Sequence, residues 1–444
     1  MKRLSLLLVL LLMAALTMVA CQPAGGTTEA PAEEAAPTEA VAEEAPAEEA
    51  APTEAPAEEA PAEEASMECT DALGCVEVAA GDPILLASAL AISGDVAPLG
   101  TDSQRGVEIA MAQRGDLLGH TVELQPEDDG CNAEGGQAAG TKIVANPQVV
   151  GIIGTTCSGA GVPMAGIVSD AGFVMVSPSN TSPALTDPDQ SWRPGYLRTA
   201  HNDLVQGAAM ANYVYNELGL RTAAAIHDGD PYTEGLSQSF ANAFTELGGT
   251  VVAIEAEAPD ATNVEPLLTT IAASEPEFLF SPVFMPLAGL LVNTARTIPG
   301  LENTILGVAD GAQDQTFLDA VAENGEGVIA SGPNLEFANA MYQDEFIPAY
   351  VEMFGEEPIQ VYHAHAFDAA NLLMNAIEQV AQQGADGSLL IGRQALRDAL
   401  YATNGYVGLT GTLTCNEFGD CADPNIAVKE VQNGEFVQLW SSKE

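Results

Sequence analysis

The stretch VVGIIGTTCSGAGVPMAGIVSDAGFVMV, residues 149–176, decides the fold of this chain. Its first apolar run, Val149 to Ile153, predicts a buried strand, and a helix-length stretch and a second short strand follow at Ala160 to Ala171 and Val174 to Val176. Strands that alternate with helices of this length indicate crossover units of a parallel sheet. The turn Thr155 to Gly159 then lies beyond the carboxyl end of a strand, where open α/β sheets bind ligands.

The same alternation continues on both sides of this unit. Before it, we expect strands at Pro83 to Ile92 and Thr121 to Gln125, and helices at Thr101 to Arg114 and Ala133 to Asn146. After a break near residue 203, we expect helices at Leu204 to Leu218, Thr233 to Leu247, Val264 to Ala273 and Leu287 to Thr297, and strands at Thr222 to His227, Thr250 to Ala256, Phe278 to Pro282 and Asn303 to Gly307. About 376 residues are too many for one ordinary core. The sequence therefore predicts an α/β protein with two doubly wound parallel-sheet lobes joined by a hinge.

Residues 1–20 are typical of a secretory signal. Met1 to Arg3 precede an apolar run from Leu4 to Leu16 that is too short to span a bilayer, and Cys21 follows after small residues. A Cys in this place is the lipid-acceptor position of bacterial lipoproteins, so we expect Cys21 to anchor the chain outside the cytoplasmic membrane. A soluble secreted protein that is cleaved nearby is the alternative.

Residues 21–68 form a repetitive segment between this signal and the folded part. The sequence APAEEAAPTEA at Ala30 to Ala40 recurs at Ala45 to Ala55, and residues 22–68 contain 14 Glu and no Lys or Arg. Because it has little apolar bulk and its charges repel one another, this segment is predicted to be a disordered, extended tether. The recurring Pro argues against the alternative of a helical stalk.

The folded part is strongly acidic as well. The whole chain has a formal net charge of −50, and residues 69–444 alone contain 49 acidic and 11 basic residues. Such a surface repels phosphate and argues against a nucleic-acid partner. The charge fits a salty habitat and an acidic lineage equally well.

Six cysteines remain after Cys21. They fall into three local pairs: Cys69 with Cys75, Cys131 with Cys157, and Cys415 with Cys421. In an oxidising compartment, proximity favours these three disulfides over the other pairings. Since no Cys-x-x-Cys pair or His-rich tract accompanies them, we expect neither a metal site nor a cofactor.

Six segments, in a fixed order, carry a resemblance to a known family. They are Ala91 to Gly106 (AISGDVAPLGTDSQRG), Glu127 to Gly130 running into Cys131, Gly151 to Ser158 (GIIGTTCS), Met175 to Thr186 (MVSPSNTSPALT), His227 to Leu236 (HDGDPYTEGL) and Phe367 to Leu372 (FDAANL). Together they resemble the leucine/isoleucine/valine-binding proteins, which are type I periplasmic binding proteins that deliver amino acids to ABC transporters. The resemblance covers residues 82–444, and it also implies the disulfide between Cys131 and Cys157.

On this basis we expect two discontinuous lobes. Lobe 1 would comprise residues 82–203 and about 334–425, and lobe 2 residues 204–333 and about 426–444, with a short Cys-bounded segment at 69–81 before them. The partners implied are a small amino acid, the permease subunits of an ABC transporter and the membrane through the lipid anchor. We expect the protein to be a monomer.

The resemblance implies a ligand site for a free α-amino acid, which needs hydrogen-bond donors for its carboxylate and acceptors for its ammonium. It assigns the carboxylate to Ser158 and Thr181, and the ammonium to Ser179, Thr181 and Asp310. Ser158 at a helix N-terminus suits an anion, although taken alone it reads as a helix cap and Ser179 to Thr181 reads as a turn. Asp310 matches only after a shift of one residue, so Asp314 stays an alternative, and either carboxylate alone reads as a loop residue or a cap.

The same comparison of motifs assigns the ligand's side chain to Leu99, Tyr232, Phe284 and Tyr362. Leu99 stands where the family often has Tyr. Without the resemblance, each of these aromatic residues would be equally well placed in the core.

Three other patterns carry less weight. His363 and His365 would point in different directions on a helix, and Asp228 with Asp230 lacks the spacing of a calcium loop. Ser158 lacks the Gly-x-Ser-x-Gly elbow of a hydrolase.

The predicted function is therefore the capture of a small amino acid, branched-chain or otherwise aliphatic, by closure of two lobes and without catalysis. The alternatives are a receptor for urea, short amides or polar amino acids, and a ligand sensor that acts on a signalling partner. A secreted hydrolase is a more distant one.

Overall fold

The computed structural model describes residues 67–336 and 339–443. The expected signal at residues 1–20, the lipid-acceptor Cys21 and the tether up to residue 66 lie outside the described residues. Within the two described ranges, none of the helices combines the length and the apolar character needed to cross a bilayer.

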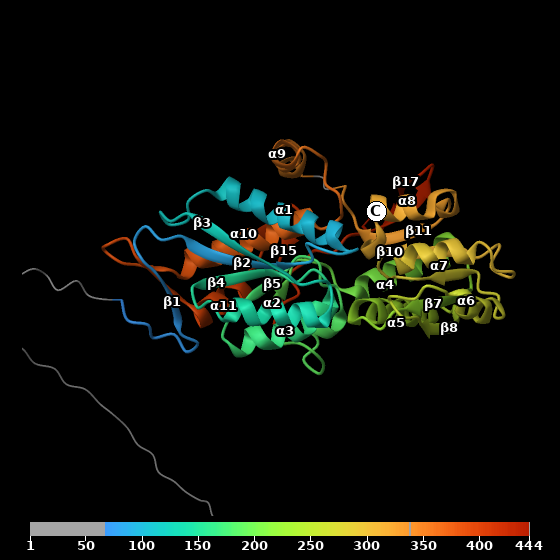
Figure 1. Cartoon of the computed structure of the whole chain (residues 1–444), viewed down its shortest axis with the longest axis horizontal. Coiled ribbons are helices and arrows are strands. Elements are labelled where there is room, and N and C mark those ends of the chain that lie inside the picture. Colours follow the sequence, from blue (N-terminus) through green and yellow to red (C-terminus); the bar gives the residue numbers. More distant parts are fainter. Residues whose placement is uncertain (1–66, 337–338, 444) are drawn as a thin grey trace, which may run out of the picture. The chain divides into compact units, whose positions relative to one another are not determined.

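Lobe 1 is built on a five-stranded parallel sheet with the strand order β3-β2-β4-β5-β6. Its strands are β2 (Ile84–Leu90), β3 (Val122–Asp128), β4 (Val149–Gly154), β5 (Met175–Ser177) and β6 (Tyr196–Arg198). Buried side chains of α1 (Ala97–Arg114) and α10 (His363–Val380) cover one face, and those of α2 (Ala133–Val144) and α3 (Ser158–Asp170) cover the other (Figure 1). Because both faces are covered, the central strand β4 is apolar throughout.

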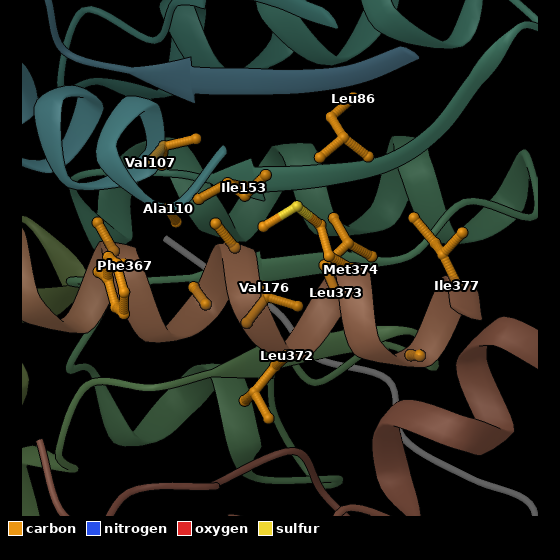
Figure 2. Close-up of a cluster of buried hydrophobic side chains, with 14 of the residues drawn as sticks. Leu86, Val107, Ala110, Ile153, Val176, Phe367, Leu372, Leu373, Met374 and Ile377 are labelled. Carbon is orange, nitrogen blue, oxygen red and sulfur yellow. The ribbon is translucent and has the colours of Figure 1, made fainter. Parts of the chain in front are cut away.

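The core of lobe 1 lies under α10. Figure 2 shows Met374 and Ile377 of this helix gathered with Leu86 of β2 and Ile153 of β4. Gly151 in β4 permits this close packing, because a Cβ atom there would lie 2.6 Å from a methyl group of Leu373.

Lobe 2 is built on a seven-stranded sheet with the order β17-β16-β11-β10-β9-β7-β8. Its strands are β7 (Thr222–His227), β8 (Thr250–Ala256), β9 (Phe278–Phe280), β10 (Ile305–Ala309), β11 (Ile329–Pro333), β16 (Ile426–Gln432) and β17 (Glu435–Ser441). One face packs on α4 (Asp203–Asn212) and α5 (Pro231–Glu246), and the other on α6 (Glu265–Ala272), α7 (Leu287–Ala295) and α8 (Gln315–Val321). The predicted α/β class with two covered sheets is confirmed.

The last two strands depart from the predicted parallel arrangement. β16 pairs antiparallel with both β11 and β17. For β16 and β17 the reason is the two-residue turn Asn433-Gly434, whose φ angles of 54° and 79° are those of a tight hairpin. A hairpin forces its two strands to run in opposite directions.

The remaining elements lie near the edges of the two sheets. The strand β1 (Cys75–Val78) pairs antiparallel with β13 (Leu389–Gly392). The others are α9 (Ile347–Phe354), β12 (Gln382–Gln383), α11 (Arg393–Tyr401), β14 (Tyr406–Val407) and β15 (Thr412–Leu413). No local pattern predicts β1, because its partner lies more than three hundred residues away along the chain.

The chain crosses between the two sheets three times, after β6, after β11 and before β16. These crossings agree with discontinuous lobes, while the exact lobe boundaries stay a prediction. All three predicted disulfides, Cys69–Cys75, Cys131–Cys157 and Cys415–Cys421, are present and therefore confirmed.

Buried carboxyl groups make the stability of this fold depend on pH. Burial raises the pKa of Asp129 and of Asp230 to about 7 and that of Asp368 to about 6. Because these values lie above those of the unfolded chain, the folded protein binds more protons, and its free energy of unfolding falls as the pH rises through this range. Burial lowers the pKa of His201 and His365, and below about pH 6.5 these two residues act in the opposite sense.

We therefore expect the free energy of unfolding, measured by urea titration, to decrease between about pH 6.5 and 8. Asp129→Asn cannot ionise and should make this decrease smaller. The exposed Asp386 is a control: its pKa lies below the ordinary value, so Asp386→Asn should leave the slope unchanged. Equal slopes for the wild type and Asp129→Asn would contradict this account.

Candidate functional site

A small cavity lies where the carboxyl ends of the strands of both sheets meet. Its volume is about 10 Å³, which is close to what a single water molecule requires. Its lining consists of Leu99, Thr156, Cys157, Ser158, Ser179, Tyr232, Phe284, Asp310 and Tyr362. Seven of the eight residues predicted to contact the ligand are among them, and the exception is Thr181.

The first wall of the cavity is the turn after β4. The backbone N–H of Thr156 donates to Asp129 Oδ2 at 2.6 Å, and that of Cys131 donates to Asp129 Oδ1 at 2.8 Å. Together with the disulfide between Cys131 and Cys157, these bonds fix the turn to the end of β3. The turn thus presents Ser158, the first residue of α3, to the cavity at the positive end of the helix dipole.

The second wall is the loop after β5. The Ser179 hydroxyl donates to the carbonyl oxygen of Thr156 at 2.8 Å, and the backbone N–H of Ser182 donates to Ser158 Oγ at 3.2 Å. Ser158 Oγ therefore accepts from the protein, while its hydrogen is oriented for donation to another acceptor.

Thr181 faces away from the cavity. Its carbonyl oxygen accepts the backbone N–H of Asp203 at 2.9 Å, where α4 begins. Its hydroxyl lies beside the Asp203 carboxylate, although neither carboxylate oxygen of Asp203 has a partner within ordinary hydrogen-bond geometry among residues 67–336 and 339–443. The structure thus does not bring Thr181 to the other predicted ligand contacts.

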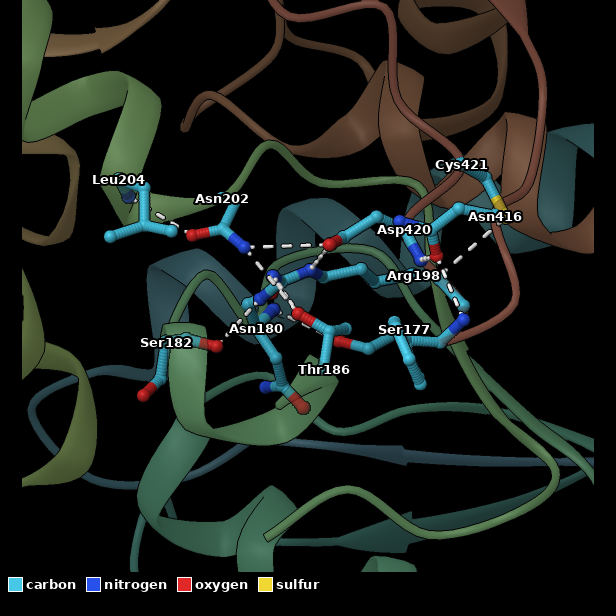
Figure 3. A network of polar contacts seen from close by, with 12 residues as sticks. Ser177, Asn180, Ser182, Thr186, Arg198, Asn202, Leu204, Asn416, Asp420 and Cys421 are labelled. Atoms are coloured by element: carbon cyan, nitrogen blue, oxygen red, sulfur yellow. Dashed lines mark hydrogen bonds and ion pairs between the residues drawn. The ribbon is translucent and has the colours of Figure 1, made fainter. Parts of the chain in front are cut away.

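A buried arginine holds this second loop in place (Figure 3). Arg198 is fully buried, and its Nη1 donates to the carbonyl oxygens of Asn180 and Ser182 at 3.1 and 2.8 Å. Its Nη2 donates to Thr186 Oγ1 at 2.8 Å, and its Nε pairs with Asp420 at 2.6 Å. Arg198 therefore ties the loop after β5 to the segment closed by the third disulfide.

Asp310 forms the opposite side of the cavity. It follows β10 directly and is only 3% exposed. Its Oδ1 accepts from Gln206 Nε2 at 2.6 Å and from the Tyr232 hydroxyl at 3.2 Å, and its Oδ2 accepts from the Tyr362 hydroxyl at 2.9 Å. Asp314, the alternative, instead caps α8 through the backbone N–H of Phe317 at 2.9 Å. The cavity therefore contains Asp310 and not Asp314.

Tyr232 and Tyr362 each contribute a hydroxyl as well as an apolar ring to the cavity. Burial keeps the pKa of both phenols well above the ordinary value, and nearby Asp310 acts in the same direction, so both hydroxyls stay protonated and donate. Phe284 packs on Tyr232 with ring centroids 5.1 Å apart, and Leu99 packs with Tyr362 and Phe284 in one apolar cluster. These apolar surfaces line the same cavity as Ser158 and Asp310.

The two lobes touch each other around this cavity. The Ser182 hydroxyl donates to the carbonyl oxygen of Pro231 at 2.8 Å. Asp230, which caps α5 through the N–H of Tyr232 at 2.8 Å, also lies against Gly159 in the first turn of α3. A Cβ atom on Gly159 would come within 2.0 Å of Asp230 Oδ2, so this contact requires glycine.

The discounted patterns prove to be structural. His363 Nδ1 lies 2.9 Å from Asp102 Oδ2, and its Nε2 lies 2.8 Å from the Tyr342 hydroxyl. Asp228 Oδ1 accepts from the backbone N–H of Asp230 and from the Thr233 hydroxyl. In the part of the chain that the structure describes, no group of three or more His, Cys, Asp or Glu side chains could hold a metal ion.

The family of the chain follows from comparison with known proteins. The model of the family "Periplasmic binding protein" matches residues 83–434. The Leu/Ile/Val-binding protein homolog 3 of Brucella melitensis is 24% identical over 78% of this chain and 91% of its own length. The leucine-, isoleucine-, valine-, threonine-, and alanine-binding protein of Pseudomonas aeruginosa is 26% identical over 79% and 90%.

Solved structures agree with this match. A leucine binding protein from Thermotoga maritima superposes with a TM-score of 0.72 at 25% identity and covers 81% of this chain and 98% of its own. The branched-chain amino acid transporter substrate binding protein of Streptococcus pneumoniae, in complex with isoleucine, gives a TM-score of 0.68 at 22% identity, covers 80% and 100%, and supports the fold alone. The chain therefore belongs to the periplasmic binding protein family, with the type I fold that its sequence motifs imply.

Proposed function

We propose that this protein captures a free α-amino acid, branched-chain or otherwise aliphatic, outside the cytoplasmic membrane and delivers it to the permease of an ABC importer. One observation carries the proposal. One small cavity is lined by a hydroxyl at a helix N-terminus, by a buried carboxylate and by apolar side chains. That arrangement complements the carboxylate, the ammonium and the apolar side chain of one small molecule.

The carboxylate of the ligand is assigned to the lobe 1 side of the cavity. Ser158 can donate its hydroxyl hydrogen, and the first turn of α3 adds backbone N–H groups and the positive end of the helix dipole. Ser179 lines the same wall. Thr181 stays a candidate only for a rearranged loop, because its hydroxyl lies beside Asp203.

The ammonium is assigned to Asp310 on the lobe 2 side. A cation taken out of water needs a counter-charge, and Asp310 is the carboxylate that lines the cavity. Leu99 and Phe284 then face the ligand's side chain, and the absence of a polar group on either supports an aliphatic substituent. The names of the relatives from Brucella and Pseudomonas include leucine, isoleucine and valine, which supports the same choice of ligand.

Capture requires the lobes to move. An amino acid cannot enter a cavity of about 10 Å³, so the lobes must separate for entry and release. A larger cavity of about 600 Å³, lined by both lobes, lies next to it and shares Phe284 with it. We propose that this is the mouth of the cleft and that closure over the ligand forms the contacts of Tyr362 and Asp230 described above.

A ligand screen tests the function. We expect L-leucine, L-isoleucine or L-valine to raise the melting temperature, because a ligand that binds only the folded state stabilises it. Urea, acetamide and polar amino acids serve as the alternative arms of the same screen. If no α-amino acid raised the melting temperature, the proposed function would be abandoned, and a shift with urea or acetamide alone would replace it.

The ammonium side and the carboxylate side of the site are tested by separate variants. Asp310→Asn should weaken amino-acid binding by about 2 to 5 kcal/mol in calorimetry, because a buried cation then lacks its counter-charge. Ser158→Ala should weaken it by about 1 to 3 kcal/mol, since the backbone donors of α3 remain.

Asp314→Asn is the matched control. This aspartate lies four residues further along, caps α8 and does not line the cavity. Because Asn caps a helix about as well as Asp does, Asp314→Asn should leave both the melting temperature and the affinity nearly unchanged. If Asp310→Asn bound amino acids as tightly as Asp314→Asn, the assignment of the ammonium would be wrong.

We further propose that Cys21 carries a lipid and that the mature protein is an anchored monomer. Mass spectrometry of the membrane fraction should find a diacylglycerol-modified Cys21 as the N-terminal residue, and Cys21→Ala should move the protein to the soluble fraction. A mature chain that retains residues 1–20 would contradict the lipoprotein assignment.

A further inference from the structure

We infer that Gln206 is the residue that positions Asp310 for the ligand's ammonium, and that it is itself held by His201 on the segment that joins the two lobes. The inference rests on the proposed function for its role in binding, while the contact between Gln206 and Asp310 stands by itself. None of the sequence motifs includes Gln206.

Gln206 lies between three separate parts of the fold. It is fully buried on α4, and its Nε2 donates to Asp310 Oδ1 at 2.6 Å and to the carbonyl oxygen of Ser331 on β11 at 3.1 Å. Its Oε1 lies 2.5 Å from His201 Nε2. His201 belongs to the crossing between β6 and α4.

The orientation of the amide follows from its neighbours. An ionised carboxylate and a backbone carbonyl are acceptors only, so the NH2 group of Gln206 must face Asp310 and Ser331. Its carbonyl oxygen must then face His201, and His201 Nε2 must carry the hydrogen of that bond. His201 Nδ1 is then the bare nitrogen, and it has no hydrogen-bond partner among the described residues. Burial lowers the pKa of His201, which agrees with a neutral ring.

The three donors to Asp310 differ in what they depend on. Tyr232 and Gln206 belong to the same lobe as Asp310 and can bond to it whether the cleft is open or closed. Tyr362 precedes α10 of lobe 1, so its bond forms only on closure. Gln206 therefore keeps the carboxylate of Asp310 aimed at the cavity before a ligand arrives, and Tyr362 adds its hydrogen bond afterwards.

Four titratable side chains surround the carboxylate of Asp310. The titratable groups that face Asp310 are Tyr232 from α5, Tyr362 from the segment before α10, His201 from the crossing and Asp203 from α4. Burial and the nearby Asp310 raise the pKa of Asp203 well above its ordinary value, which favours its neutral form. The side chains that donate to Asp310 are thus the amide of Gln206 and the two phenols.

The first test measures the affinity for L-leucine as a function of pH. Gln206→Leu should weaken binding roughly ten-fold to a hundred-fold at pH 7, because a hydrogen bond to a charged group is lost. It should also move the acid limb of the affinity profile, which is the range where binding is lost as the pH falls, to higher pH. The reason is that a carboxylate with fewer donors is protonated more readily. A role of Gln206 in packing alone would lower the melting temperature without moving that limb.

Two further variants sharpen the result. Gln313→Leu is the matched control, because Gln313 Nε2 donates to the same Ser331 carbonyl oxygen at 2.8 Å but its side chain makes no bond to Asp310. It should leave both the affinity and the acid limb unchanged. Gln206→Glu should bind poorly at pH 8 and approach the wild type at pH 6, because a protonated Glu can donate as Gln does whereas an ionised one repels Asp310.

The second test needs no ligand. In a double-mutant cycle of thermal unfolding, Gln206→Leu should lower the melting temperature clearly more in the wild-type background than in Asp310→Ala. Equal shifts in the two backgrounds, or an unchanged acid limb in Gln206→Leu, would overturn the inference. If no amino acid bound to the wild type, the proposed function would fall, and the cycle would still decide whether Gln206 supports Asp310.

Discussion

The burial of one charged carboxylate between two lobes is the constraint on which the rest of the site depends. An ion taken out of water without partners costs several kcal/mol, so Asp310 could not occupy its position if the surrounding side chains did not supply hydrogen bonds. Gln206, Tyr232 and Tyr362 supply them. Each comes from a different element, so this one charge ties α4, α5 and the segment before α10 to the end of β10.

The two walls of the cavity are stabilised in different ways. On the lobe 1 side, the Cys131–Cys157 disulfide, the Asp129 carboxylate and the Arg198 network fix the two loops before any ligand is present. On the lobe 2 side, Asp310 is fixed by hydrogen bonds alone, one of which crosses the cleft. Under the proposed assignment, the wall that binds the ligand's carboxylate is fixed by the lobe itself, whereas the environment of Asp310 changes as the lobes close. That difference would let the protein recognise a ligand in the open state and retain it in the closed one.

Much of the fold could be predicted from the sequence, because strands and helices of regular length alternate and each apolar run is local. The resemblance to the binding-protein family also indicated Ser158 and Asp310, which lie in the segments after β4 and β10, and the carboxyl ends of these strands meet at the cleft. The choice between Asp310 and Asp314 required the structure, because both follow the same strand and only the backbone decides which one caps α8.

Residues whose partners are distant along the chain could not be predicted from the sequence. Gln206 lies on the buried face of a correctly expected helix, and that was the available signal, since a buried polar side chain needs a partner. Its partner Asp310 is 104 positions away along the chain. Thr181 does not line the cavity for the same kind of reason, because its carbonyl oxygen accepts from the start of α4 and its hydroxyl lies beside Asp203. The antiparallel hairpin of β16 and β17 was missed for a different reason, since its turn Asn433-Gly434 is a local signal that apolar patterns alone do not include.

The contact between Gly159 and Asp230 has a consequence for evolution. One lobe leaves a gap the size of a methyl group, and the other lobe fills it with an acidic side chain. A side chain gained at position 159 would keep the lobes apart unless position 230 became smaller in the same lineage. These two positions, one in each lobe, are therefore expected to covary among relatives, as residues on two facing protein surfaces do.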